Sequence, residues 1–221
     1  MFREFRSGGR SLGAFEFFFS FYGLLLGLSV AVIATGLATA IQHRKKIRIG
    51  WLTPMLALFV GLDIASFWDS AWVNFRHLPF SYGLLVGGLA IALVYFVAAS
   101  LVFPHDLDDG QSLDDHFWAN KQVVLLLTTA ANLVGYLVIV IANLERADGM
   151  VRIMSYVPAL ALYAGLVIPA AFARKKTLFT TLIGLHIVIY LLIAAASAAL
   201  PDLMAAGGYA ETTPAAGTAA P

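Results

Sequence analysis

The chain has 221 residues, of which 60% are hydrophobic and 12% are charged, and its mean hydropathy is +0.83. Such an apolar composition excludes a water-soluble fold and is typical of a protein that crosses a bilayer several times. The net charge is only +1 and the basic residues lie in short loops, which excludes a nucleic-acid-binding surface. The absence of cysteine excludes disulfides, thiolate metal sites and a cysteine nucleophile.

The first expected element, after an N-terminal tail at 1–15, is a membrane span at 16–41. Its preceding arginines and the "ATA" at 38–40 are also features of a secretory signal. The apolar run is longer than the roughly 7–15 residues of a signal core, however, and "HRKKIR" follows it directly, so we expect a retained span.

Five further spans are expected at 49–74, 80–103, 119–144, 151–173 and 177–200, because charges and prolines interrupt the chain at intervals that fit a hydrocarbon core about 30 Å thick. The sequence therefore predicts an all-α fold, a six-helix transmembrane bundle of three helical hairpins over residues 16–200. The segment 203–221 is rich in Gly, Ala, Thr and Pro and is expected to be a disordered C-terminal tail.

Basic residues predict the orientation. Eight of the 14 lysines and arginines flank the side of the loops at 42–48, 104–118 and 174–176, and the remaining six lie on the side of the termini. Because basic residues concentrate on the cytoplasmic side, both termini are expected outside, although the basic N-terminus argues the other way.

Small residues recur on the first and third spans. "YGLLLG" at 22–27 is repeated as "YGLLVG" at 82–87, and the first span also has a small residue at every fourth position. Such a ridge lets another backbone approach closely. The pattern favours packing inside the bundle over a homo-oligomer or membrane-partner interface. In either case the contacts would use Gly23, Gly27, Gly83 and Gly87, and Ala31, Thr35 and Thr39 would complete the ridge of the first span.

The second span contains "GLDIASFWDSAW" at 61–72, with two carboxylates in an apolar run. Asp63 lies fifteen residues after Arg48 and thirteen before Arg76, near the middle of the bilayer. Asp69 lies about 120° away around the helix and near its end, beside interfacial tryptophans. One face of the span carries Asp63, Ser66, Ser70 and Asn74.

Two other spans carry similar polar faces, with Thr128, Asn132, Tyr136 and Asn143 on the fourth and His186, Tyr190 and Ser197 on the sixth. The even-numbered helices run in one direction, so Asp63, Asn132 and His186 fall at about the same depth. If the faces converge, they form a polar vestibule closed on the basic side. Its floor would be these three residues, and its approach would be lined by Tyr136, Tyr190, Ser66 and Ser70.

A charged side chain at the centre of a span costs about 2.5–3.5 kcal/mol on insertion scales, so Asp63 should face the bundle and find a partner. His186 is the natural partner. Two interpretations stay open at this point: a titratable site for protons or cations, or polar side chains whose hydrogen bonds only fix helix register.

The loop at 104–118 is acidic, and Ser112 with Asp115 fits a capping box for a helix that begins near residue 113. We expect its acids to pair with the basic loops of the same side or with water. The alternatives are a partner-docking surface and a divalent-cation site. The spacing does not fit an EF-hand, and the candidate metal ligands are Asp108, Asp109, Asp114, Asp115 and His116.

Enzymatic and cofactor chemistry is not expected. Retinal requires a lysine inside a span, but every lysine here lies in a loop or at the edge of an expected span. Haem between helices usually requires two axial ligands, whereas His186 is the sole deeply placed histidine. The sequence also lacks the HExxH and GxSxG motifs. We therefore predict no cofactor and no catalytic residues.

The strings "FEFFFSFYGLLLGLSVA", "RIGWLTPMLALF" and "SLVFP" before the acidic loop resemble a family of small, uncharacterised bacterial inner-membrane proteins over most of residues 15–145. The resemblance implies a bacterial inner-membrane location. It transfers no site residues, because the family has no assigned function. The leading functional prediction is a small transporter or channel-like protein, and the alternative is a non-catalytic scaffold or accessory subunit.

Overall fold

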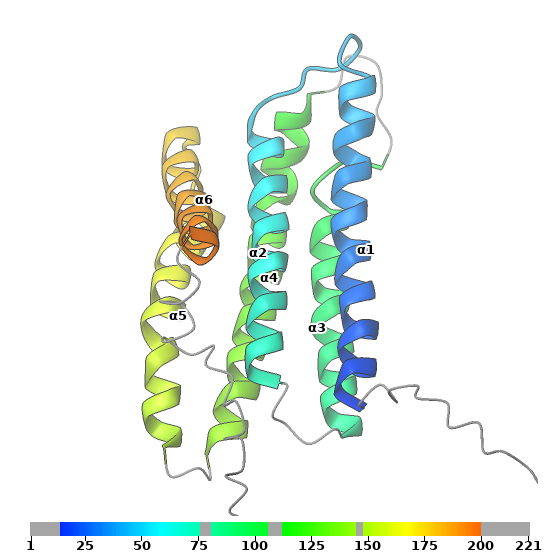
Figure 1. Cartoon of the computed structure of the whole chain (residues 1–221). Coiled ribbons are helices and arrows are strands. Elements are labelled where there is room, and N and C mark those ends of the chain that lie inside the picture. The colour runs from blue at the N-terminus through cyan, green and yellow to red at the C-terminus, as the bar shows by residue number, and fades with distance from the viewer. Residues whose placement is uncertain (1–13, 76–80, 106–111, 145–147, 200–221) are drawn as a thin grey trace, which may run out of the picture.

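The computed structural model describes residues 14–75, 81–105, 112–144 and 148–199. These residues form six helices and no strand, in the order α1 (Ala14–Gln42), α2 (Leu52–Phe75), α3 (Tyr82–Ser100), α4 (Leu113–Asn143), α5 (Gly149–Phe172) and α6 (Lys176–Ala199) (Figure 1). All six are long and apolar enough to cross a membrane. The predicted six-helix all-α bundle is confirmed, and the chain is a multi-pass membrane protein.

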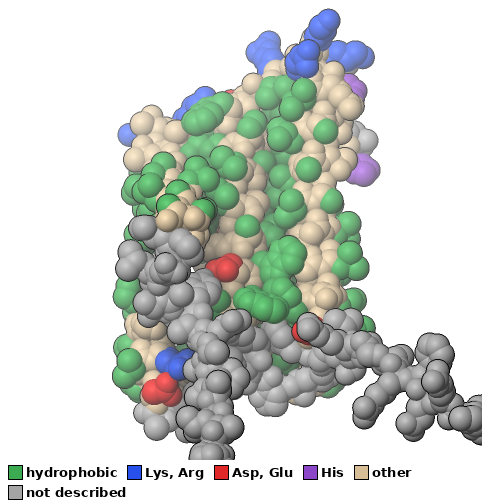
Figure 2. Space-filling model, viewed as in Figure 1, with side chains coloured by type: hydrophobic (Ala, Val, Ile, Leu, Met, Phe, Trp, Pro, Cys, Tyr) green, Lys and Arg blue, Asp and Glu red, His purple; other side chains and the backbone are tan. Residues whose placement is uncertain are grey.

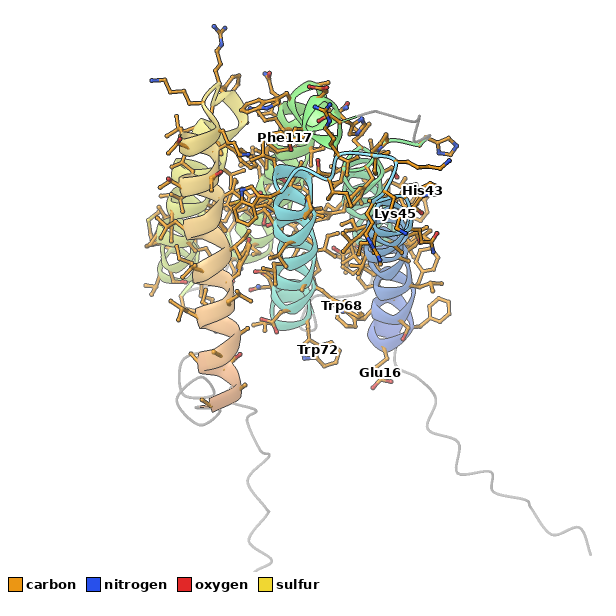
Figure 3. All side chains as sticks on the ribbon, turned by 90° about the horizontal axis from the view of Figure 1, so that it is seen from above. Glu16, His43, Lys45, Trp68, Trp72 and Phe117 are labelled. Atoms are coloured by element: carbon orange, nitrogen blue, oxygen red, sulfur yellow. The ribbon has the colours of Figure 1, made fainter. Side chains whose placement is uncertain are left out.

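Helix α2 is the central element of the bundle. It packs against α1, α3, α4 and α6, and it is the most buried of the six spans. Figure 1 shows α1 and α3 on one side of α2 and α4, with α5 and α6 on the other. Viewed from above, α2 lies between α6 and α1, and Trp68 and Trp72 lie on the side of α2 toward α1 (Figure 3). A polar residue on α2 can therefore be reached from both halves of the bundle.

The connections at one end of the bundle are held by hydrogen bonds to backbone carbonyl groups. The buried ammonium group of Lys121 donates to the carbonyls of Ala170 and Ala171, at 3.3 and 2.7 Å, where α5 ends. A cation at a helix C-terminus satisfies orphan carbonyls and complements the helix dipole. The Thr53 hydroxyl donates to the carbonyl of Leu113 at 3.0 Å. Of the lysines and arginines that the structure describes, most of the exposed ones lie at this end (Figure 2).

Helix α4 begins at Leu113, six residues before the predicted span, and Ser112 is its N-cap residue. The predicted capping box is not formed, because the Ser112 side chain makes no cap hydrogen bond. Instead, residues 112 and 113 pair with the α1–α2 connection, where the Leu113 amide donates to the carbonyl of Arg48 at 3.2 Å. The Asp115 amide, which a capping box would pair with the Ser112 hydroxyl, donates to the Ser112 carbonyl at 3.2 Å.

The prediction that the glycine ridges pack inside the bundle holds at one position and not at three others. A Cβ atom at Gly23 would lie 2.7 Å from the Trp68 ring, so this position does serve packing inside the bundle. At Gly27, Gly83 and Gly87 a Cβ atom would meet no other helix within 4 Å. Ala31 and Thr35 are exposed on α1. A homo-oligomer or membrane-partner seam over these positions stays a prediction.

The tightest glycine contact between α2 and α4 gives a test of the packing. A Cβ atom at Gly135 would lie 2.5 Å from the Phe67 ring, which is itself buried between Tyr22 and Tyr95. We expect Gly135→Ala to destabilise the protein by about 1–3 kcal/mol through overpacking. The measurement is reversible unfolding in detergent.

Gly27→Ala is the matched control, because it adds the same methyl group where nothing lies within 4 Å. It should be neutral or stabilising by up to about 1 kcal/mol, the helix-propensity difference between alanine and glycine. Equal effects of the two substitutions would contradict the described packing of α4 on α2.

Candidate functional site

Asp63 lies at the midpoint of α2, eleven residues after its first residue and twelve before its last. Its side chain is 1% exposed. Burial of a carboxylate away from water is unfavourable unless its oxygens accept hydrogen bonds or it takes up a proton. The side chains around Asp63 therefore determine whether its carboxylate can stay charged.

Three neutral side chains from three other helices donate to this carboxylate. The Tyr190 hydroxyl of α6 donates to Oδ1 at 2.7 Å, and the Tyr95 hydroxyl of α3 donates to Oδ2 at 3.0 Å. The Asn132 amide of α4 lies 3.2 Å from both oxygens. Among the described residues, no lysine, arginine or histidine forms an ion pair with Asp63. Burial opposes the charged carboxylate, whereas the three donors stabilise it.

His186 is next to this network but does not bond directly to Asp63. Its ring, 3% exposed, packs edge-to-face against Phe59, Tyr163 and Tyr190, with centroid distances of 5.5, 5.2 and 4.6 Å. Its Nδ1 atom is buried and has no hydrogen-bond partner among the described residues. The direct Asp63–His186 pair expected from the sequence is thus replaced by a connection through Tyr190. Tyrosine and asparagine already occupy the carboxylate oxygens.

A partly enclosed cavity of about 230 Å³ adjoins the network. It is formed by the C-terminal halves of α2 and α4, by residues 156–163 of α5 and by residues 186–193 of α6. Most of it therefore lies in the half of the bundle where α1 begins and α6 ends. Six of the seven side chains proposed from the sequence line it, namely Ser66, Ser70, Asn132, Tyr136, His186 and Tyr190. Asp63 does not line it, and lies one hydrogen bond behind Asn132 and Tyr190.

The cavity does not continue toward the basic end of the bundle. There the helices pack tightly through large side chains that are at most 1% exposed: Phe59, Phe117, Leu125, Phe179 and Ile183. Phe117 and Phe179 form an edge-to-face pair with centroids 4.7 Å apart. The polar faces of α2, α4 and α6 therefore meet around a space that ends at the depth of Asp63.

Two tyrosines of the site were not singled out from the sequence. The Tyr95 hydroxyl donates to Asp63. Tyr163 donates to the Thr128 hydroxyl at 3.2 Å and packs edge-to-face against His186. Both belong to odd-numbered helices, where the sequence shows no polar stripe. The available signal was a lone tyrosine deep in an apolar span, since a buried tyrosine hydroxyl usually finds a hydrogen-bond partner.

The candidate metal ligands of the acidic loop fall into two groups. Asp108 and Asp109 lie outside the described residues. The imidazole Nε2 of His116 lies 3.0 Å from the carbonyl oxygen of Leu101, at the end of α3. The part of the chain that the structure describes contains no group of three or more histidine or acidic side chains able to hold a metal ion, so Asp114 and Asp115 do not form such a site there.

No protein-family model, no curated protein and no solved structure matches this chain. The geometry of Asp63 and the neighbouring cavity therefore carries the functional argument.

The hydrogen bond from Tyr95 can be tested by removing its hydroxyl group. We expect Tyr95→Phe to destabilise the protein by about 1–3 kcal/mol, because a buried carboxylate loses a donor. Tyr82→Phe serves as the control, since Tyr82 is 80% exposed. Unfolding in detergent measures both variants, and an unchanged stability of Tyr95→Phe would contradict the network.

Proposed function

We propose that this protein is a small membrane transporter or channel-like protein in which Asp63 is the titratable group that couples movement to protons or monovalent cations. The observation that carries the proposal is a carboxylate at the midpoint of the central helix, held by neutral donors alone and placed one hydrogen bond from a cavity. Ionisable residues at this depth typically mark ion and proton pathways.

Tyr190 provides the connection between the carboxylate and the cavity. Its hydroxyl donates to Asp63 at 2.7 Å and its side chain also lines the cavity. A hydroxyl group both donates and accepts hydrogen bonds, so it can pass a proton from water in the cavity to the carboxylate. Asn132 has the same double position, and its amide can hold the carboxylate oxygens in place while the proton is exchanged.

The rival proposal is a membrane scaffold or accessory subunit. Its specific support is that the bonds of Asp63 tie α2 to α3, α4 and α6 while the carboxylate stays 1% exposed. Such a network can fix helix register without any transport. The two proposals differ in what removal of the carboxylate changes.

The location proposed with this function is the bacterial inner membrane, with both termini outside. Two observations support it: the resemblance given by residues 15–145, and the excess of lysine and arginine, eight against six, on the side opposite the termini.

The test is proton and cation flux into proteoliposomes, comparing the wild-type protein with Asp63→Asn. We expect flux in the wild type and only the background of empty vesicles in Asp63→Asn, because the amide keeps the shape of the carboxylate but cannot titrate. A thermal melt of each protein checks that it is folded.

Asp69→Asn is the matched control, since it makes the same chemical change on another face of the same helix, and it should retain flux. Wild-type flux in a folded Asp63→Asn protein would contradict the transport proposal. Absence of flux from every protein, with Asp63→Asn merely less stable, would favour the scaffold.

A further inference from the structure

The charge around the cavity has one sign. None of the described side chains that line it is a lysine or arginine. Asn132 and Tyr190 line it and donate to Asp63. When Asp63 is ionised, the cavity therefore adjoins a negative charge that no described basic side chain of its lining balances. In a low-dielectric interior, this charge attracts cations and repels anions.

A third of the residues that line the cavity are phenylalanine or tyrosine. Six rings line it, from Phe67, Phe75, Tyr136, Tyr156, Tyr163 and Tyr190. Aromatic faces attract organic cations, and recognition of ammonium groups commonly uses such surroundings. The volume of about 230 Å³ exceeds that of a cavity of about 150 Å³ that holds benzene. The space thus suits a ligand somewhat larger than one aromatic ring.

His186 adds a polar ring to the cavity wall. Its imidazole is 3% exposed and packs against three aromatic rings, and its Nδ1 atom has no hydrogen-bond partner among the described residues. A neutral imidazole offers one acceptor nitrogen, and the tyrosine hydroxyls can also accept. An ammonium group has only N–H donors, so it complements these acceptors.

We infer that the cavity binds a small organic ammonium ion, with its charge at the floor formed by Asn132, Tyr190 and His186 and its apolar body against the aromatic walls. This inference deepens the proposed function, because it names the substrate class of the same site. At the rim, Leu162 and Ile193 are 47% and 52% exposed. A rim of this kind suits a substrate with an apolar part.

Other ligand classes fit less well. Within the described lining, an anion would meet no lysine or arginine, and it would lie close to Asp63. A divalent metal ion prefers several carboxylates, and the described residues offer no group of three or more histidine or acidic side chains. A small inorganic cation would leave most of the aromatic-lined volume unfilled.

The test uses three probes of similar size and shape: phenethylammonium, phenethyl alcohol and phenylacetate, which are cationic, neutral and anionic at neutral pH. Binding of each to the full chain in nanodiscs is measured by equilibrium dialysis, with empty nanodiscs subtracted. We expect phenethylammonium to bind about tenfold more tightly than the alcohol, and phenylacetate to bind most weakly.

Two variants locate the site. In Asp63→Asn, the preference for the cation over the alcohol should fall to about one, whereas Asp69→Asn should keep it. Ser66→Phe should abolish binding of the cation by filling the cavity that Ser66 lines. If Asp63→Asn does not fold, the probe series and Ser66→Phe still decide the question.

Three results would overturn the inference: equal binding of the cation and the alcohol, strongest binding of phenylacetate, or cation binding that Ser66→Phe leaves unchanged. Absence of binding by all three probes would overturn it as well. The assay involves no gradient or flux. Binding without flux in proteoliposomes would therefore contradict the transport proposal alone, and flux without binding would contradict this inference alone.

Discussion

A carboxylate removed from water at the middle of a membrane protein has to be satisfied by its neighbours, and the arrangement of this bundle around Asp63 follows from that constraint. The acid lies on the most buried helix, and donors from α3, α4 and α6 reach it. Four of the six helices thus depend on one side chain. Every donor is neutral, so the charge of the site changes whenever Asp63 gains or loses a proton.

The proposed role of this arrangement beyond stability rests on the cavity. Asn132 and Tyr190 have one side toward the carboxylate and another toward the open space, which connects a sealed acid with a volume that a ligand or water can enter. On the other side, tightly packed aromatic residues such as Phe117 and Phe179 close the bundle. The asymmetry, open toward one end and closed toward the other, is what an access pathway to a mid-membrane site requires.

Hydropathy and helical periodicity predicted the six spans and the polar faces of the even-numbered helices, because both signals are local. The predicted direct pair of Asp63 with His186 was wrong. Which side chain reaches a buried carboxylate depends on its length and rotamer, and Tyr190, on the same helix face as His186, donates to Asp63 instead. Tyr95 was missed because a single tyrosine gives no periodic signal. The capping box predicted at Ser112 was wrong, because the Asp115 amide donates to the Ser112 carbonyl and not to its hydroxyl.

The most direct test of the account is whether Asp63 titrates in the folded protein. Infrared difference spectra between acidic and alkaline pH, compared between the wild-type protein and Asp63→Asn, isolate the carboxyl stretch of this residue. The account predicts a protonated-carboxyl band in the wild type that disappears as the pH rises and is absent from the variant. Identical difference spectra of the two folded proteins would show that Asp63 does not change its protonation state, and would contradict its role as the coupling group.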